Sequence, residues 1–107
     1  MTYVYFIQQG YGGIKVGVSD DPGARCAHMQ TGTSKRLRVL ARFPFASRAE
    51  AFEMERSLHA KFAHLRTSGE WFKPALLREL KVGGRRLIGG TKRNPTGGLA
   101  GAAIEAA

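Results

Sequence analysis

The stretch TYVYFIQQGYGGIKVGV, residues 2 to 18, holds two runs of β-branched and aromatic residues separated by glycines. Such runs favour strands, and the glycine-rich segment between them suits the turn of a β-hairpin. If the turn centres near Tyr11, Tyr5 lies opposite Gly17 and shares a face with Lys15. The apolar side chains then point to the other face, which we expect to be the core: Val4, Phe6, Ile14, Val16 and Val18.

The residues after the hairpin predict a short helix and a third strand. Asp21 followed by Pro22 is typical of a helix start and Gly32 of a helix end, so a helix of about ten residues carries Arg25. Residues 36 to 43 (RLRVLARF) alternate between basic and apolar types. We expect a half-buried strand whose outer face is an arginine stripe formed by Arg36, Arg38 and Arg42.

A capping box, Ser47 to Glu50, predicts a longer helix that runs to about His64. Residues 70 to 73 (EWFK) indicate a short extended piece, and residues 74 to 81 a last amphipathic helix. The expected fold class is therefore α+β, with a small central antiparallel three-stranded sheet flanked by helices.

The composition changes after Val82. Residues 83 to 107 hold seven of the fourteen glycines, four basic residues and few bulky ones, so we expect no packed core there. Residues 1 to 82 are predicted to form one domain, and residues 83 to 107 a flexible, basic Gly/Ala-rich tail. The last nine residues of that tail, 99 to 107, could form a short helix.

The chain carries seventeen Lys and Arg against eight Asp and Glu, a net charge of +9. Such an excess favours phosphate-bearing partners, although it is also a common means of keeping a protein soluble. No apolar run approaches the length of a membrane helix, and the N-terminus lacks the pattern of a signal peptide. A single cysteine, Cys26, allows no internal disulfide. We therefore expect a cytoplasmic protein with no membrane association.

One carboxylate falls on the apolar side of the longer predicted helix. At about 100° per residue, its buried sector comprises Ala51, Met54, Leu58, Phe62 and Leu65. Glu55 lies inside that sector, whereas Glu53 lies on the opposite, solvent-facing side. Because burial of a carboxylate costs several kcal/mol unless it is paired, two interpretations stay open: an ion pair with an arginine, or a metal ligand.

Short motifs in the chain resemble those of the GIY-YIG nuclease superfamily. Tyr3 to Ile7 (YVYFI) resembles its first motif, with Tyr5 at the tyrosine, and Ile14 to Gly17 (IKVG) resembles its second, with Gly17 at the glycine. Arg25 and Glu55 stand where the family carries a helix arginine and a metal-binding glutamate. Over roughly residues 3 to 73, the chain resembles most the small phage and bacterial branch named after a meiotically up-regulated gene.

The resemblance implies a GIY-YIG-like fold and metal-dependent hydrolysis of phosphodiester bonds, as in a DNA endonuclease or nicking domain of a bacterial or phage-infected cell. The implied cofactor is Mg²⁺ or Mn²⁺, held by Glu55. Tyr5 would accept a proton from the attacking water, and Arg25 would clamp the phosphate. Lys15 replaces the tyrosine of the second motif and could neutralise phosphate charge or act as a base. His59, one helical turn after Glu55, resembles the branch's histidine and completes the expected catalytic set.

Each of these residues also has a plain structural interpretation. Tyr5 could be an ordinary strand aromatic, Lys15 an exposed lysine, Arg25 a solvated charge and His59 a hydrogen-bonded member of the core.

The expected partner is DNA, or RNA, along a path of arginines. That path comprises Arg36, Arg38, Arg42, Arg85 and Arg86, although a solvated strand face would look the same in sequence. Two other functions stay open: a catalytically inactive nucleic-acid-binding module of the same fold, and a small basic protein that binds another protein.

Overall fold

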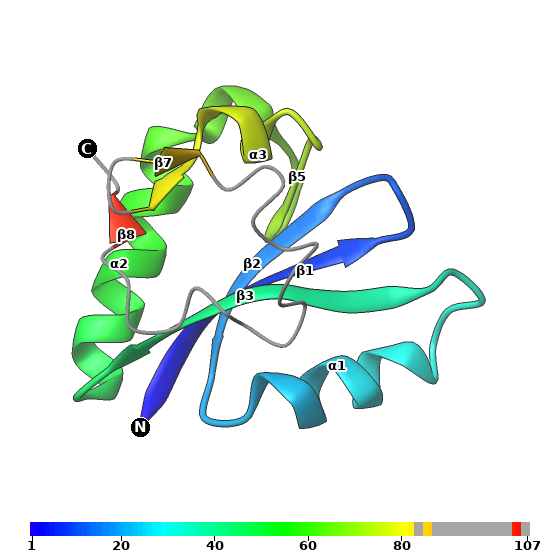
Figure 1. Cartoon of the computed structure of the whole chain (residues 1–107), viewed down its shortest axis with the longest axis horizontal. Helices are drawn as coiled ribbons and strands as arrows, with labels where there is room; N and C mark the ends of the chain where they lie inside the picture. The colour runs from blue at the N-terminus through cyan, green and yellow to red at the C-terminus, as the bar shows by residue number, and fades with distance from the viewer. Residues whose placement is uncertain (83–84, 87–103, 106–107) are drawn as a thin grey trace.

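The computed structural model describes residues 1–82, 85–86 and 104–105. Its main elements follow in the order β1 (Thr2–Gln9), β2 (Ile14–Ser19), α1 (Pro22–Gln30), β3 (Leu37–Phe45), α2 (Arg48–Lys61), the 3-10 helix η1 (Ala63–Leu65), β4 (Arg66–Ser68), β5 (Trp71–Phe72) and α3 (Leu76–Glu79). The five strands form one antiparallel sheet in the order β3-β1-β2-β5-β4, and α1 and α2 lie on its two sides (Figure 1). The predicted α+β class is confirmed. The predicted three-stranded sheet is wrong, because the β4–β5 hairpin adds two short strands to the edge of β2.

A second, small sheet involves the C-terminal part of the chain. It joins β6 (Lys81–Val82), β7 (Arg85–Arg86) and β8 (Ile104–Glu105) in the order β7-β6-β8. The helix predicted for residues 99 to 107 is therefore wrong at residues 104 and 105, which form a strand paired with β6. The rest of the predicted flexible tail lies outside the described residues.

The β1–β2 hairpin has the predicted register. Tyr5 pairs with Gly17, and the turn is closed by Gly10 in a left-handed conformation with φ of 57°. The face predicted to be core is buried against α2, and it is completed by residues of β3, of α2 with its C-cap, and of β5: Leu40, Ala41, Phe43, Ala51, Leu58, Phe62 and Phe72. The helical spacing of α2 thus placed its buried side correctly.

The two longer helices begin at the predicted caps. The Asp21 carboxylate accepts a hydrogen bond from the Ala24 amide at 3.1 Å, and Pro22 is the first residue of α1. The Ser47 hydroxyl accepts from the Glu50 amide at 3.2 Å and donates to the Glu50 carboxylate at 3.1 Å. The helix α2 ends at Lys61, three residues earlier than predicted, and η1 follows it. The helix α3 is likewise shorter than the predicted residues 74 to 81.

A β-bulge in β3 breaks the predicted alternation. Phe6 pairs with Ala41 but Ile7 pairs with Val39, so Leu40 is an extra residue in β3. Even-numbered residues of β3 therefore point to one face of the sheet before the bulge and to the other face after it. The predicted arginine stripe is wrong for this reason.

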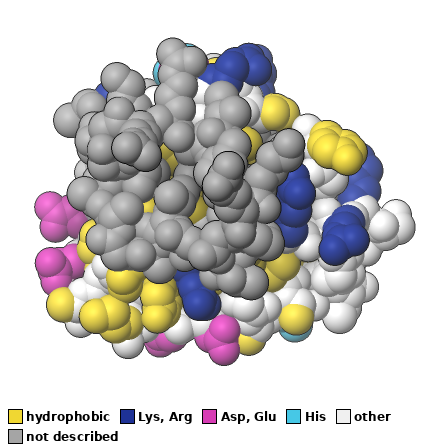
Figure 2. All heavy atoms as spheres, viewed as in Figure 1, with side chains coloured by type: hydrophobic (Ala, Val, Ile, Leu, Met, Phe, Trp, Pro, Cys, Tyr) yellow, Lys and Arg dark blue, Asp and Glu magenta, His cyan; other side chains and the backbone are white. Residues whose placement is uncertain are grey.

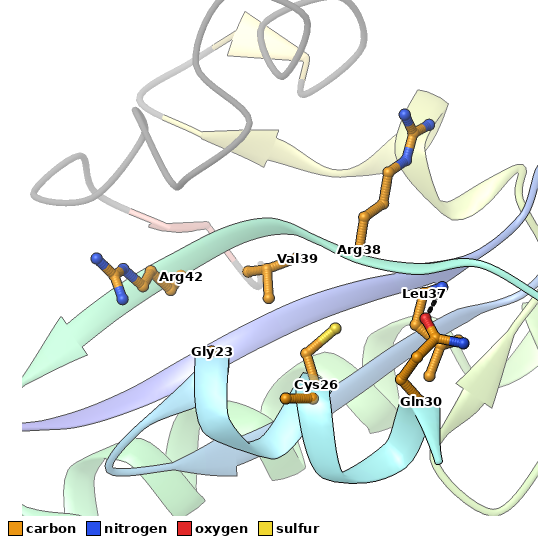
Figure 3. A pocket seen from close by; sticks show the side chains of 8 residues that line it. Gly23, Cys26, Gln30, Leu37, Arg38, Val39 and Arg42 are labelled. Carbon is orange, nitrogen blue, oxygen red and sulfur yellow. Dashed lines mark hydrogen bonds between the residues drawn. The ribbon is translucent and has the colours of Figure 1, made fainter. Parts of the chain in front are cut away.

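The contacts of the two strand arginines agree with this change of face. Arg38, before the bulge, donates to the Gln8 side chain at 3.2 Å, and it points away from α1 (Figure 3). Arg42, after the bulge, shares a face with Tyr5, and its guanidinium lies 5.5 Å from the centre of the Tyr3 ring.

The second face of the sheet is also buried. Tyr5, Ile7 and Leu37 form a small apolar cluster, against which Cys26 and Met29 of α1 pack. The helix α1 therefore covers the face that carries Tyr5. In the described part of the chain, none of the helices has the length and apolar character needed to cross a lipid bilayer.

Candidate active site

Side chains from several elements line one open cavity of about 580 Å³. Tyr5 comes from β1, Arg25 from α1, Glu55 from α2, and Glu70 from the residue directly before β5. The rest of the lining comes from the end of β2, the β2–α1 connection, the start of α1 and the start of α2: Val18, Ser19, Asp20, Asp21, Ala24, Arg48 and Phe52. Three of the five predicted catalytic residues, Tyr5, Arg25 and Glu55, thus meet at this cavity.

Tyr5 is held by close packing against Gly17. Its side chain is only 1% exposed, and a Cβ atom on Gly17 would lie 2.5 Å from the Tyr5 hydroxyl oxygen. Burial raises the pKa of Tyr5, while a hydrogen bond with Arg25 acts in the opposite direction. The phenol therefore stays protonated at neutral pH. It serves more readily as a hydrogen-bond donor than as the proton acceptor suggested by the sequence.

Glu55 is half-buried and faces a second carboxylate. The pKa of Glu55 is raised from 4.5 to about 7, first by burial and then by the negative charge of Glu70 and a hydrogen bond between the two side chains. Lys15 and Arg56 act in the opposite direction. The three salt bridges found among the described residues all leave Glu55 out, so the interpretation of Glu55 as half of an arginine ion pair finds no support there.

Glu70 is the site residue that sequence reasoning missed. Its backbone oxygen accepts a hydrogen bond from the Val16 amide at 3.0 Å, and its carboxylate lies 3.2 Å from the Lys15 ammonium. Both contacts depend on the pairing of β2 with β5. The only local signal is Gly69, whose positive φ of 53° turns the chain into β5, and a glycine alone does not point to a site.

The structure places the other two predicted catalytic residues beside the cavity rather than in its lining. The Lys15 side chain is 14% exposed, pairs with Glu70 and lies 5.6 Å from the centre of the Trp71 ring. His59 has its Nε2 3.0 Å from the Val16 carbonyl oxygen and packs edge-on against Phe72, with 4.9 Å between ring centres. These contacts are those of a hydrogen-bonded core residue.

The arginines predicted to follow nucleic acid are spread over several surfaces. Arg38 and Arg42 border a separate cavity of about 560 Å³ between α1 and β3, where Cys26 and Val39 face each other (Figure 3). Arg36 borders another hollow near the β1–β2 turn. The side chains of Arg85 and Arg86 lie outside the described part of the chain. Nucleic-acid binding by these arginines stays a prediction.

The surface charge is uneven on the face seen in Figure 2. Lys and Arg side chains lie mainly on its right-hand half, and Asp and Glu side chains lie along its left and lower edges.

The two carboxylates suit a hard divalent cation. Among the described residues, no group of three or more His, Cys, Asp or Glu side chains is placed to hold a metal ion. Mg²⁺, however, is commonly held by one or two carboxylates and completes its shell with water and substrate phosphate. A cation between Glu55 and Glu70 would relieve the crowding of negative charge that raises the pKa of Glu55. The residues present therefore fit Mg²⁺ or Mn²⁺.

The family model for the T5orf172 domain matches residues 2–84. This is a distinct family, and nothing in the match points to the GIY-YIG superfamily, so the resemblance predicted from the sequence is wrong. The motifs behind it were short, and the packing of Tyr5 on Gly17 is by itself a reason for a tyrosine and a glycine at paired strand positions. No match was found among curated proteins or among solved structures.

Proposed function

The chain belongs to the T5orf172 domain family, and we propose that it is a metal-dependent endonuclease or nicking domain that hydrolyses phosphodiester bonds in DNA. The observation that carries the proposal is the meeting of the Glu55 and Glu70 carboxyl groups with Tyr5 and Arg25 in one open cavity. Paired carboxyl groups beside an arginine provide one site for a cation and one for a phosphate.

Each residue of the cavity has its own role in the proposed reaction. Glu55 and Glu70 hold a divalent cation, which when bound supplies positive charge that stabilises the attacked phosphate and the departing oxygen. Arg25, exposed at the cavity, binds the phosphate through two parallel N–H donors. The Tyr5 hydroxyl oxygen accepts a hydrogen bond from the Arg25 guanidinium and orients it. Lys15, paired with Glu70, keeps that carboxylate turned toward Glu55.

Incubation of supercoiled plasmid with the purified chain and Mg²⁺ or Mn²⁺ tests the proposal. We expect the wild type to nick the plasmid and Glu55→Gln to be slower by about 100-fold or more, the usual loss when a group that stabilises transition-state charge is removed. Glu53→Gln is the matched control, because Glu53 is an exposed glutamate of the same helix and does not line the cavity. Equal nicking by Glu55→Gln and wild type would reject the assignment.

A second function is favoured by the ion pair in the site. Because the Lys15 ammonium lies 3.2 Å from the Glu70 carboxylate and competes with a cation for it, the alternative is a domain that binds nucleic acid without cutting it. In that case the plasmid binds, the affinity falls steeply with salt, and no strand breaks form with any cation. If the chain does not bind the plasmid even at low salt, a partner protein becomes the better candidate for its ligand.

A further inference from the structure

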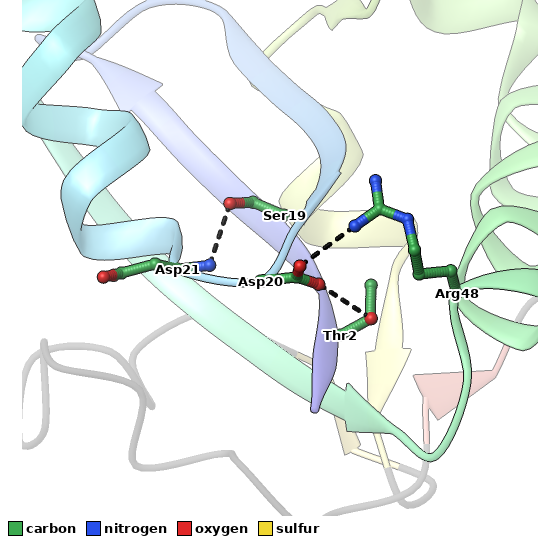
Figure 4. Close-up of polar contacts among 5 residues, drawn as sticks. All are labelled: Thr2, Ser19, Asp20, Asp21 and Arg48. Atoms are coloured by element: carbon green, nitrogen blue, oxygen red, sulfur yellow. Dashed lines mark hydrogen bonds and ion pairs between the residues drawn. The ribbon is translucent and has the colours of Figure 1, made fainter.

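Arg48 lines the cavity and forms an ion pair with the β2–α1 connection. It is the first residue of α2, and its Nη1 lies 3.0 Å from one carboxylate oxygen of Asp20. The other oxygen of Asp20 accepts a hydrogen bond from the Thr2 hydroxyl at 2.8 Å (Figure 4). Arg48 and Asp20 both line the cavity, so this ion pair forms part of its wall.

Stability does not explain an arginine at this position. The side chains of Arg48 and Asp20 are 60% and 61% exposed, and ion pairs so open to solvent contribute little to folding. The first turn of a helix is also the positive end of the helix dipole, where a cationic side chain is unfavourable. An arginine placed there at some cost, beside a cavity, points to a negatively charged ligand.

The Arg48 guanidinium lies over an aromatic ring, and among the described residues one hydrogen bond, to Asp20, is found for it. It lies 5.6 Å from the centre of the Phe52 ring, and Phe52, 39% exposed, lines the same cavity. Stacking on an aromatic ring leaves the edges of a guanidinium free for hydrogen bonds. One of its five N–H donors is taken by Asp20.

We propose that Arg48 binds a phosphate of the nucleic-acid strand next to the phosphate at Arg25, and that Asp20 holds Arg48 at the cavity wall until that phosphate displaces the carboxylate. The proposal rests on the proposed function in one respect, namely that the ligand is the same phosphodiester strand. The Thr2 hydroxyl keeps Asp20 in place after its release from Arg48.

Fluorescence anisotropy with a labelled duplex oligonucleotide, in EDTA and over a range of salt, measures this contact without cleavage. We expect Arg48→Gln to weaken binding about fivefold, and the slope of log affinity against log salt to fall by about 0.9, the value for one lost phosphate contact. Arg78→Gln, an exposed arginine of α3 that does not line the cavity, should leave the slope closer to wild type.

Asp20→Asn should change the affinity for the oligonucleotide in the opposite direction. It frees Arg48, and we expect tighter binding by several-fold. Asp21→Asn is the matched control, because it removes the same charge from the same rim without touching Arg48, and asparagine still caps α1. In an Arg48→Gln background, the gain from Asp20→Asn should shrink to that of Asp21→Asn.

The proposal is overturned if Arg48→Gln keeps wild-type affinity and slope, or if Asp20→Asn gains no more than Asp21→Asn. Plasmid nicking separates this failure from that of the proposed function. Metal-dependent nicking together with a wild-type-like Arg48→Gln rejects only the role of Arg48. The expected binding pattern without strand breaks under any cation supports the role of Arg48 and rejects only the nuclease.

Discussion

Tyr5 and Gly17 face each other across the β1–β2 hairpin, and their contact fixes the phenol in the cavity. A Cβ atom at residue 17 would lie 2.6 Å from the ring carbon that carries the hydroxyl, and the ring is too buried to swing away freely. We predict that Gly17→Ala destabilises the domain by about 1–3 kcal/mol, as overpacking does, and lowers nicking at least tenfold by displacing the hydroxyl.

Thermal unfolding and plasmid nicking measure the two effects. Gly23→Ala is the control, because a Cβ atom there comes no closer than 3.6 Å to any neighbour and lies within α1. That substitution should be neutral or slightly stabilising. Full activity in Gly17→Ala would show that Tyr5 does not need its observed position.

The proton on Glu55 makes the stability of the domain depend on pH. The folded pKa of Glu55 is about 7, above the ordinary value of 4.5, so the folded state binds this proton more tightly than the unfolded state does. The resulting stabilisation is complete below pH 4.5 and is lost as the pH rises through 7. A displacement of this size corresponds to about 3 kcal/mol, which solvent screening at a half-exposed group reduces to about 1–2 kcal/mol.

Urea unfolding at pH 5 and pH 8 checks this expectation. The loss of stability between the two pH values should be smaller for Glu55→Gln than for the wild type by about 1–2 kcal/mol, whereas Glu53→Gln should behave as the wild type does. If Glu55→Gln and the wild type lost the same free energy of unfolding between pH 5 and pH 8, the pKa of Glu55 would not be raised in the folded state.

The sequence predicted the site residues whose positions depend on neighbours close by in the chain. Helical spacing alone turned Glu55 toward the buried side of α2, and hairpin spacing paired Tyr5 with Gly17. Glu70 was missed because its position depends on the pairing of β2 with β5, which are more than fifty residues apart in the chain. No local pattern around residue 70 contains that information.

The elements that sequence reasoning predicted well are those with their own caps or turns. The hairpin has its glycine turn, α1 has Asp21 and Pro22, and α2 has Ser47 and Glu50. Each of these signals acts within a few residues. Boundaries at the C-terminal ends of the helices were less accurate, because α2 tightens into η1 without a glycine to stop it.

Two features of the strands could not be predicted from local sequence patterns. The strand β4 is exposed along its whole length, so it lacks the alternation that marks a half-buried strand. The bulge at Leu40 lies within an apparently regular alternation, and only the fit of β3 against β1 reveals it. The error about the arginine stripe follows directly from this bulge.

Considered as a whole, the molecule buries both faces of its sheet and builds its cavity where β1, α1 and α2 approach one another. The core between the sheet and α2 and the smaller cluster under α1 hold these elements in place. The side chains of the cavity are therefore supported by packed elements rather than by loops alone. Such support suits a site in which a few tenths of an ångström matter.

The most direct test of the proposed cation site is the thermal unfolding of the whole chain with and without Mn²⁺ at pH 8. An ion that binds only the folded state stabilises it, by about 2.7 kcal/mol at a concentration one hundred times its dissociation constant. For a domain of this size, that gain should raise the melting temperature by roughly 10 °C. We predict this rise for the wild type and for Glu53→Gln, and its loss in Glu55→Gln. An equal rise in Glu55→Gln, or no rise in the wild type, would contradict a cation site at Glu55.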